Sequence, residues 1–351
     1  MRFTVSFVVA GFAAAAVPAA AQPQPPDPPR VVLRDTIRPG TVRVYQGRNI
    51  GPEQTERFSR KVKLGRDGRV SLTNISGDVT VTGGSGDEVS IDAVKRTRGD
   101  KSELAVVQIT VEDRPGRVDI RTEGEQNRSD RYRRGNQVSI DYTLTVPASA
   151  SLELHSISGS VKVTGVQGGV RAETISGNVT TIDTPKLELA KTVSGDVSLT
   201  GTAEGDVSAG SISGNVVVKN LKARGLDLST ISGNVSVTDA VCDRLGIKSV
   251  NGNVEYAGTI AKAGRYDITS HSGNIRLMLA NPAGFELNAT SFSGSIRSEL
   301  ALTIGGDAGR RDTGRSRDRG MSSHSMRATY GDGSATLSVR TFSGDIVVAK
   351  R

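Results

Sequence analysis

Residues 226–237 read Leu-Asp-Leu-Ser-Thr-Ile-Ser-Gly-Asn-Val-Ser-Val, and this stretch predicts β-structure. Apolar and polar residues alternate on both sides of the Ser-Gly pair, which is typical of strands with one buried face. The apolar positions are expected to be Leu226, Leu228, Ile231, Val235 and Val237. The alternation slips by one residue between Leu228 and Ile231, and such a slip beside a glycine indicates a bend or bulge. The stretch therefore predicts two short strands joined by a corner.

The phrase Ile-Ser-Gly-Asn-Val, or a close variant, occurs ten times in the 351 residues. Its central glycines are Gly77, Gly159, Gly177, Gly195, Gly214, Gly233, Gly252, Gly273, Gly294 and Gly344. From Gly159 to Gly294 they are spaced 18, 18, 19, 19, 19, 21 and 21 residues apart. A fixed period of this length is the signature of a solenoid, in which each coil pairs in parallel with the next about 4.8 Å away. We expect an all-β parallel β-solenoid, similar to a β-helix, with coils of 18–21 residues.

Two stretches interrupt the period. Between Gly77 and Gly159 the apolar alternation is longer and turn-linked, which predicts irregular, partly antiparallel strands up to about residue 150. Regular coils are expected over residues 151–300. The Gly/Arg/Ser-rich segment 305–325 is too polar to bury and predicts a mobile loop, before the final strands at 326–351.

The N-terminus has the pattern of an export signal. Met1-Arg2 supplies a positive charge, residues 5–17 are apolar, and Ala19-Ala20-Ala21 offers a cleavage site after Ala21. The apolar stretch is shorter than the roughly 20 residues of a spanning helix. We expect a signal peptide at 1–21, a Pro-rich linker at 22–30 and a β-strand-repeat domain at 31–351, with its first strand near residues 31–44. The mature chain is expected in the periplasm or outside the cell, without a transmembrane anchor.

Composition excludes several classes of protein. Tryptophan is absent and aromatic residues make up 4%, which fits a narrow core of small aliphatic side chains. The single cysteine, Cys242, excludes an intramolecular disulfide framework and a cysteine-based zinc site, and is expected to fill space in the core. The net charge of +8 becomes +7 once Arg2 is removed with residues 1–21. Arg310–Arg319 could contact a polyanion, but its Gly, Ser and Asp residues favour a solvated loop, and nothing indicates specific nucleic-acid recognition.

These residues resemble a known family. The recurrent Ile/Val-Ser-Gly-Asn/Asp-Val phrase, with Asp-Tyr-Thr-Leu-Thr-Val-Pro at residues 141–147 ahead of the closely spaced copies, is similar to the bacterial β-strand-repeat family labelled putative adhesin, a domain of unknown function. The resemblance covers roughly residues 60–351. It implies a β-helix-like fold in exported or envelope-associated proteins, and it transfers no catalytic residue.

Catalysis on a glycan would need two carboxyl groups about 5 to 10 Å apart. The position after the motif glycine is acidic at Asp78, Asp196 and Asp345, but the coils beside Asp196 place Asn178 and Asn215 there, so no acidic pair is expected. The stacked Ser and Asn side chains can hydrogen-bond along the coils, or present a polar stripe to a glycan. Carboxylates of the irregular portion could still converge; the candidates are Glu112, Asp119 and Asp141.

The sequence shows no motif for metal, phosphate or calcium binding. The three histidines, His155, His271 and His324, stand in unrelated contexts, and no glycine-rich phosphate loop or calcium-binding repeat is present. We predict no catalytic, cofactor-binding or metal-binding residue and no cofactor. The leading hypothesis is a non-catalytic binding or structural protein of the envelope, adhesin-like, whose partner is a glycan or a protein. The alternatives are a carbohydrate-active β-helix enzyme, or an envelope-stress sensor or scaffold that binds a charged ligand.

Overall fold

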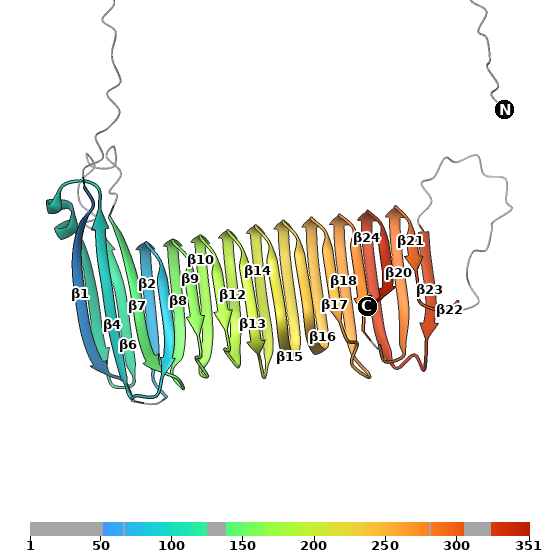
Figure 1. Ribbon diagram of the computed structural model, residues 1–351, viewed down its shortest axis with the longest axis horizontal. Coiled ribbons are helices and arrows are strands. Elements are labelled where there is room, and N and C mark those ends of the chain that lie inside the picture. The colour runs from blue at the N-terminus through green and yellow to red at the C-terminus, as the bar shows by residue number, and fades with distance from the viewer. Residues whose placement is uncertain (1–51, 66, 125–137, 281, 305–323) are drawn as a thin grey trace, which may run out of the picture. The chain divides into compact units, whose positions relative to one another are not determined.

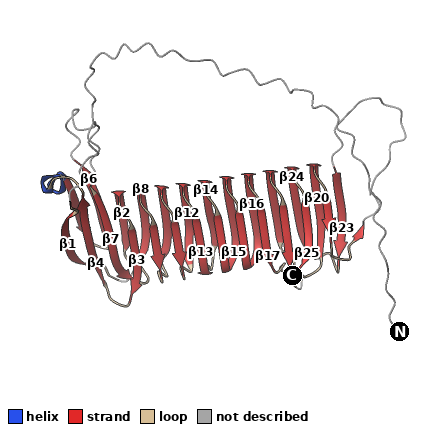
Figure 2. Ribbon diagram, turned by 45° about the horizontal axis from the view of Figure 1, so that its top comes forward, coloured by secondary structure: helices blue, strands red, loops and turns tan. Residues whose placement is uncertain are grey.

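A computed structural model of the chain describes residues 52–65, 67–124, 138–280, 282–304 and 324–351. These residues lie mostly in strands, with one short 3-10 helix, η1 (Lys101–Val106) (Figure 2). The prediction of an all-β chain is confirmed. None of the described residues belongs to a helix long and apolar enough to cross a membrane.

Several predicted segments lie outside the described residues. They are the signal peptide at 1–21, the Pro-rich linker at 22–30, the first strand near 31–44 and the basic run Arg310–Arg319. The predicted loop at 305–325 is described only at its end, where His324 and Ser325 begin strand β23 (His324–Tyr330).

The regular repeats pair strand by strand in parallel. Strands that lead into a corner are β8 (Ser151–Ser158), β10 (Gly169–Ser176), β12 (Lys186–Ser194), β14 (Asp206–Ser213) and β18 (Arg265–Ser272). Strands that leave one are β9 (Val161–Thr164), β11 (Val179–Ile182), β13 (Val197–Thr202), β17 (Val254–Gly258) and β19 (Ile275–Leu279). Two longer strands, β15 (Val216–Ser232) and β16 (Val235–Asn251), run from one corner to the next. Val179 is typical, because it lies in register between Val161 and Val197. Figure 1 shows the strands of successive coils side by side.

The N-terminal portion mixes orientations, as expected. Its strands are β1 (Gln54–Lys63), β2 (Arg69–Ser76), β3 (Val79–Gly84), β4 (Glu88–Thr97), β5 (Val107–Arg114), β6 (Arg117–Gly124) and β7 (Ser139–Pro147). β4 pairs antiparallel with β1 and β7, and β5 pairs antiparallel with β6. In contrast, β2 pairs in parallel with β6 and β8, and β3 with β7 and β9. The first copy of the motif, at Gly77, therefore lies directly beside the copy at Gly159.

At the C-terminal end the order of coils departs from the order of the chain. The remaining strands are β20 (Phe285–Ser293), β21 (Ile296–Ser298), β22 (Thr303–Ile304), β24 (Ala335–Ser343) and β25 (Ile346–Lys350). β24 pairs in parallel with both β18 and β20, and β25 with both β19 and β21. The last copy, at Gly344, thus lies between the copies at Gly273 and Gly294 (Figure 1). β23 pairs antiparallel with β20 and β22.

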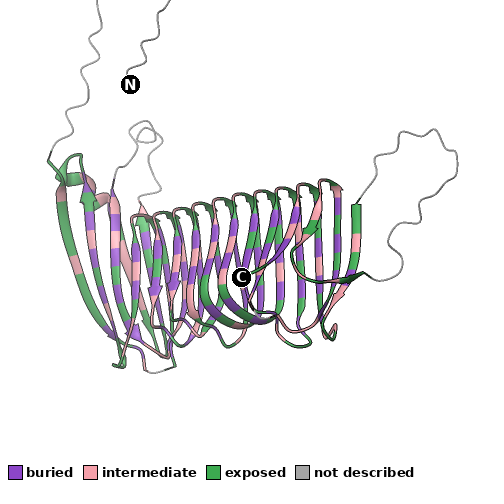
Figure 3. Ribbon diagram, turned by 45° about the vertical axis from the view of Figure 1, so that its right-hand side comes forward, coloured by how far each residue is buried: buried purple, intermediate pink, exposed green. Residues whose placement is uncertain are grey.

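Burial confirms one assignment of faces and corrects another. Val235 is buried and Asn234 beside it is exposed, as period-two alternation requires. Ile231, however, is 49% exposed, and Thr230 is buried in its place. The alternation therefore continues through Thr230, and the slip comes two residues later, at the Ser-Gly pair. Figure 3 shows this alternation of buried and exposed residues along the strands.

Hydrogen bonding at the corner accounts for most of the residues in the repeated phrase. In one coil, the amides of Gly214 and Val216 donate to the carbonyl oxygens of Ser232 and Asn234 in the next coil, each at 2.9 Å. Two groups are left over, and side chains satisfy them. The amide of Asn215 donates to Oδ1 of Asp196 at 2.7 Å, and the carbonyl of Gly214 accepts from the Thr230 hydroxyl at 3.1 Å. Buried backbone groups need such partners, which accounts for the hydroxyl and the Asn or Asp in the phrase.

The glycine of the phrase is required by backbone conformation and by crowding. Gly177 has φ +144°, a region that side-chain-bearing residues rarely adopt. A Cβ atom added there would overlap the carbonyl oxygen of Gly159 in the neighbouring coil. The corner therefore accepts only glycine without distortion.

The side chains after the motif glycines, together with Asp141 at one end, form one continuous ladder. Each member except the last accepts a hydrogen bond from the backbone amide of the next, at 2.7–3.4 Å. In spatial order the members are Asp141, Asp78, Ser160, Asn178, Asp196, Asn215, Asn234, Asn253, Asn274, Asp345 and Ser295. The donor common to every step is a backbone amide, whereas among the described residues a side-chain amide donates within the ladder only from Asn215 to Asp196, at 3.3 Å, so this polar stripe has a structural role.

Candidate binding groove

The first residue of the repeated phrase is aliphatic yet faces outward in the first copy, at Ile75, and in the six coils that follow it. We call the residues of these six coils the aliphatic column; its members, Ile157, Ile175, Val193, Ile212, Ile231 and Val250, are 41–52% exposed. The hydrogen bonds and glycine conformation of the corner do not depend on this position. A contiguous row of exposed aliphatic side chains on a soluble surface is a common mark of an interaction site.

The aliphatic column lines a groove of about 760 Å³ that crosses strands β2, β8, β10, β12, β14, β15 and β16, with Thr73 and Asn74 of β2 at one end. Two residues before each aliphatic residue stands a second outward-facing position, which we call the outer column. Its members are His155, Glu173, Lys191, Gly210, Ser229 and Lys248. Gly210 and Ser229 keep the middle of the groove free of large side chains.

Between the two columns lies a buried row of hydroxyl residues, Ser156, Thr174, Thr192, Ser211, Thr230 and Ser249, each 3–6% exposed. Their hydroxyls point into the corner; Thr192, for example, donates to the carbonyl of Gly177 at 2.8 Å. Ser156 is the exception. The carbonyl oxygen of Gly77, which corresponds to the acceptor of the Thr192 hydroxyl, already accepts from the side-chain amide of Asn74. The Ser156 hydroxyl therefore lacks a described partner. Apart from the buried Ser156 hydroxyl, the base of the groove therefore offers apolar surface rather than free hydrogen-bonding groups.

The two ends of the groove differ in charge. At the end near β8, His155 contacts Glu173 at 3.2 Å and Glu153 at 3.5 Å, which places two carboxylates there. Toward β16, Lys248 is exposed and forms no ion pair with any residue that the structure describes, and the same is true of Lys191. The outer column thus carries a carboxylate, Glu173, near one end and two lysines without a described ion pair, Lys191 and Lys248, further along.

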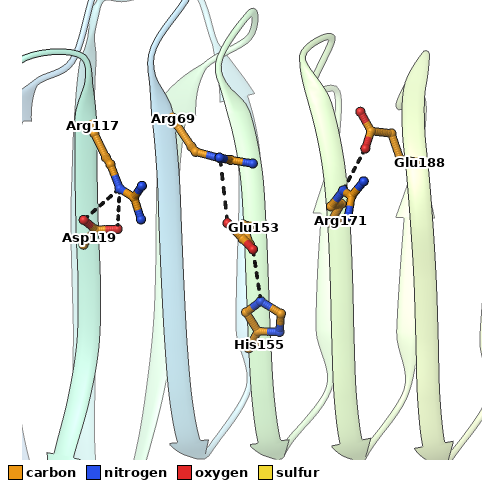
Figure 4. Close-up of polar contacts among 7 residues, drawn as sticks. All are labelled: Arg69, Arg117, Asp119, Glu153, His155, Arg171 and Glu188. Carbon is orange, nitrogen blue, oxygen red and sulfur yellow. Dashed lines mark hydrogen bonds and ion pairs between the residues drawn. The ribbon is translucent and has the colours of Figure 1, made fainter.

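The carboxylates on the neighbouring outer face are held in ion pairs (Figure 4). Both carboxylate oxygens of Asp119, which is 4% exposed, share the one N–H that Nε of Arg117 donates, at 3.0 and 2.9 Å, and this bond raises the pKa of Arg117. Glu188 lies 2.7 Å from Nε of Arg171. Neighbouring arginines thus neutralise both carboxylates.

The three carboxylates suggested for catalysis do not come together as a set. Glu112 and Asp119 are register partners on β5 and β6, but each has its own arginine, Arg114 for Glu112 and Arg117 for Asp119. Asp141 lies on β7, which pairs with β3 and β4 instead.

One aspartate of the stripe after the glycines, Asp78, has an acidic neighbour that lies outside the copies of the phrase. The amide of Asp78 donates to Oδ1 of Asp141 at 3.0 Å, so these two aspartates are neighbours. They meet because β7, from the irregular portion, lies beside β3 and supplies an extra member of the ladder. Oδ2 of Asp141 is 2.9 Å from Arg96. A structural bond and an ion pair therefore occupy both oxygens of this carboxylate.

An aromatic stack continues the aliphatic column, and sequence reasoning missed it. The rings of His271 and Phe342 stack at 5.0 Å, and those of Phe342 and Phe292 at 4.7 Å. Phe342 joins the other two only because β24 is inserted between β18 and β20. The spacing of the copies along the chain carried no signal of this insertion.

The remaining candidates are apart from one another. His155 lies in the groove, His271 in the aromatic stack and His324 in β23. Among the described residues, no cluster of three His, Cys, Asp or Glu side chains could hold a metal ion. Cys242 is buried within β16, and this burial raises the pKa of its thiol to about 12.

Comparison with known proteins agrees with the resemblance noted from the sequence. The family model described as Toastrack DUF4097 matches residues 69–349. No curated protein matches the chain.

Several crystal structures are similar in fold. One is a putative adhesin from Bacteroides fragilis, 12% identical, with a TM-score of 0.41 over 84% of this chain and 97% of that one. A putative adhesin from Parabacteroides merdae is 11% identical, with a TM-score of 0.40 over 84% and 96%. A putative lipid binding protein from Parabacteroides distasonis is 10% identical, with a TM-score of 0.34 over 84% and 96%.

Proposed function

The chain belongs to the Toastrack DUF4097 family, and we propose that it is a non-catalytic binding protein of the cell envelope. We propose further that its fold is a parallel β-solenoid with coils of 18–21 residues. On this view the protein binds its partner along a regular outer face of the solenoid. The parallel register of the described strands supports this architecture. The observation that carries the function is the groove along the aliphatic column.

The groove supports binding because the fold does not require its apolar surface. Exposed Ile and Val side chains at one position of six successive coils lose contact with water only when something covers them. The other positions of the phrase serve the corner, through the glycine, the hydroxyl row and the ladder. The aliphatic column is therefore the part of the repeat that a binding role explains best.

We place the protein outside the cytoplasm, in the periplasm or beyond. The proposal rests on residues 1–21, which have the charge, apolar stretch and small residues of a cleaved export signal. Residues 22–30 would then link the cleavage site to the β-strand-repeat domain. Mass spectrometry of the exported protein tests this, and an intact Met1 would contradict it.

The absence of catalysis is part of the proposal. Glycoside chemistry needs a pair of carboxyl groups free to exchange protons or attack the substrate. Glu112, Asp119 and Asp141 are instead engaged by Arg114, Arg117 and Arg96. Turnover of bacterial glycans that is lost on substituting one of these carboxylates, with the fold intact, would contradict this view.

Capture from an envelope extract tests the binding role. Wild-type protein and two variants of β16 would be immobilised, and retained lipids and proteins compared. Val250→Asp places a charge in the groove, whereas Val241→Asp changes a valine of similar exposure, 45% against 41%, outside the groove. We expect a component retained by wild type and Val241→Asp but lost with Val250→Asp. Equal retention by all three would contradict the groove as the binding surface.

A further inference from the structure

We propose that the groove binds one extended hydrocarbon chain that ends in a carboxylate, as in a long-chain fatty acid. This inference rests on the proposed binding function and names the chemical class of the ligand. Three properties of the groove carry it: the missing hydrogen-bonding groups, the length and the distribution of charge.

The base of the groove favours a hydrocarbon chain over a peptide. The strands beneath it pair with neighbours on both sides, as β12 does with β10 and β14. Hydroxyls of the buried row, such as those of Thr192 and Ser211, donate to corner carbonyls at 2.8 Å. A peptide lying in the groove would leave its own amides and carbonyls without partners along this base, which is costly. A chain of methylene groups needs no partners and gains from leaving water.

The length of the groove suits one chain in extended form. From Ile157 to Val250 the aliphatic column spans five coil steps, about 24 Å at the usual strand spacing. One leaflet of a bilayer is about 15 Å of hydrocarbon, so the groove can hold a complete acyl chain. The surface is also concave, which fits a single chain better than the flat face of a membrane.

Charge sets the direction of the ligand. At the β8 end His155 contacts Glu173, and Arg69 is already paired with Glu153, so neither cation is free to pair with a ligand carboxylate and the apolar tail is expected there. At the other end Lys248 is free of described ion pairs. Arg340, two register steps further along the same outward position, is also exposed. The ligand carboxylate is therefore expected beside Lys248, with the tail running over Ile231 and Ile212 toward Ile157.

Titration with palmitate below its aggregation concentration, at about pH 8 where the carboxylate is ionised, tests the proposal. We expect saturable binding of one palmitate per chain by calorimetry. Ile212→Asp and Val250→Asp should each weaken binding about tenfold or more, because the first puts a charge against the tail and the second puts a negative charge beside the ligand carboxylate. Val241→Asp should bind as wild type does. Thermal unfolding by circular dichroism shows whether each variant is folded, and both groove positions are exposed enough to tolerate the change.

A second pair of variants tests the direction of the ligand. Lys248→Glu should weaken palmitate binding about tenfold, whereas Lys219→Glu, an exposed lysine of β15 outside the groove, should not. Neutral monopalmitoylglycerol should lose much less affinity with Lys248→Glu. If the two lysine variants changed the affinity for palmitate equally, the assigned direction of the ligand would be wrong, and so would the proposal that its carboxylate is recognised.

Two further outcomes would overturn the fatty-acid proposal without contradicting the proposed binding function. If palmitate does not bind but phosphatidylglycerol vesicles sediment with wild type and not with Val250→Asp, the occupant is a membrane surface. If neither binds, yet capture from the envelope extract still depends on Val250, the groove binds another class of partner. In that case the fatty-acid inference fails and the proposed function stands.

Discussion

The backbone amide of Asp345 donates to Oδ1 of Asn274 at 2.9 Å, although 71 residues separate the two in the chain. The next bond of the ladder runs from Ser295 back to Oδ1 of Asp345, at 2.7 Å from the amide and 2.9 Å from the hydroxyl. The last copy of the motif is therefore an internal coil. Two copies that are neighbours in sequence, at Gly273 and Gly294, are held apart by it.

Because of these hydrogen bonds, the ionised carboxylate of Asp345 stabilises the folded protein, and this contribution depends on pH. The amide and hydroxyl of Ser295 favour the ionised carboxylate and lower the pKa of Asp345. A carboxyl group whose pKa is lower in the folded than in the unfolded state stabilises the fold at pH values above its unfolded pKa of about 4. This contribution is lost as the pH falls through the folded pKa. Asp345→Asn keeps an Oδ1 acceptor without the charge, so its stability should fall less between neutral and acid pH.

Urea unfolding midpoints across the acid range measure this difference. Asp227→Asn is the control, because it removes an exposed carboxylate that has no hydrogen bond or ion pair with a described residue. The wild type and Asp227→Asn should lose stability in parallel on acidification. An Asp345→Asn variant with the same pH dependence as these two would contradict the argument.

Gly177→Ala should destabilise the protein by about 2 to 4 kcal/mol. The backbone at Gly177 has φ +144°, and an added Cβ would overlap the carbonyl oxygen of Gly159. Gly205→Ala provides the matched control, since a Cβ there meets nothing within 4 Å. Its effect should stay within about 0.5 kcal/mol. Chemical denaturation gives both values, and similar losses would show that the corner tolerates a side chain.

Val235→Asp should cost about 4 kcal/mol, because it buries an unpaired charge in the core. Asn234→Ser should cost about 1 kcal/mol or less. It weakens one ladder bond, the one from the amide of Asn253 at 2.9 Å, and a serine already fills this place at Ser160. Denaturant melts of the two variants should therefore differ clearly, and equal midpoints would reverse the assignment of faces.

The sequence predicted the strands and the corner but not which side of the corner the aliphatic residue takes. Ile231 is more apolar than Thr230, so hydrophobicity alone placed Ile231 in the core. The corner reverses this preference, because the inward position must supply a hydroxyl to the carbonyl of Gly214. That requirement depends on the neighbouring coil, 16 residues away, and the groove depends on it in turn.

Contacts between distant segments were also beyond the reach of the repeat pattern. Asp141 joins the ladder beside Asp78 because β7 pairs with β3, and Asp141 belongs to no copy of the phrase. Phe342 stacks between His271 and Phe292 because β24 is inserted out of chain order. A period along the chain predicts which residues share a column, but not the order in which the coils are stacked.

The thiol of Cys242 should react with Ellman's reagent only as fast as the protein unfolds. The side chain is 2% exposed, and burial raises its pKa to about 12, so neither access nor thiolate is available at neutral pH. The labelling rate should rise steeply through the urea unfolding transition. Rapid labelling in buffer would indicate a reactive cysteine or a locally open β16.

The insertion of the last coil can be tested by cross-linking across it. Thr269 of β18 and Thr290 of β20 are both register partners of Arg340 in β24, one on each side. Adjacent strands lie about 4.8 Å apart, within the range for a disulfide, whereas strands two steps apart are separated by about 10 Å, beyond it. The double variant Thr269→Cys/Arg340→Cys should therefore oxidise to an intramolecular disulfide, as should Thr290→Cys/Arg340→Cys.

The third pair, Thr269→Cys/Thr290→Cys, separates the two stacking orders. With β24 between them these cysteines cannot meet, whereas stacking in chain order would place them side by side and leave Arg340 at the end. The native Cys242 is buried and should not compete. Oxidation at low protein concentration, followed by mass analysis of peptides without reduction, identifies the bond. A disulfide in the third pair, with none between positions 269 and 340, would show that the coils follow the chain and that Asp345 does not bridge Asn274 and Ser295.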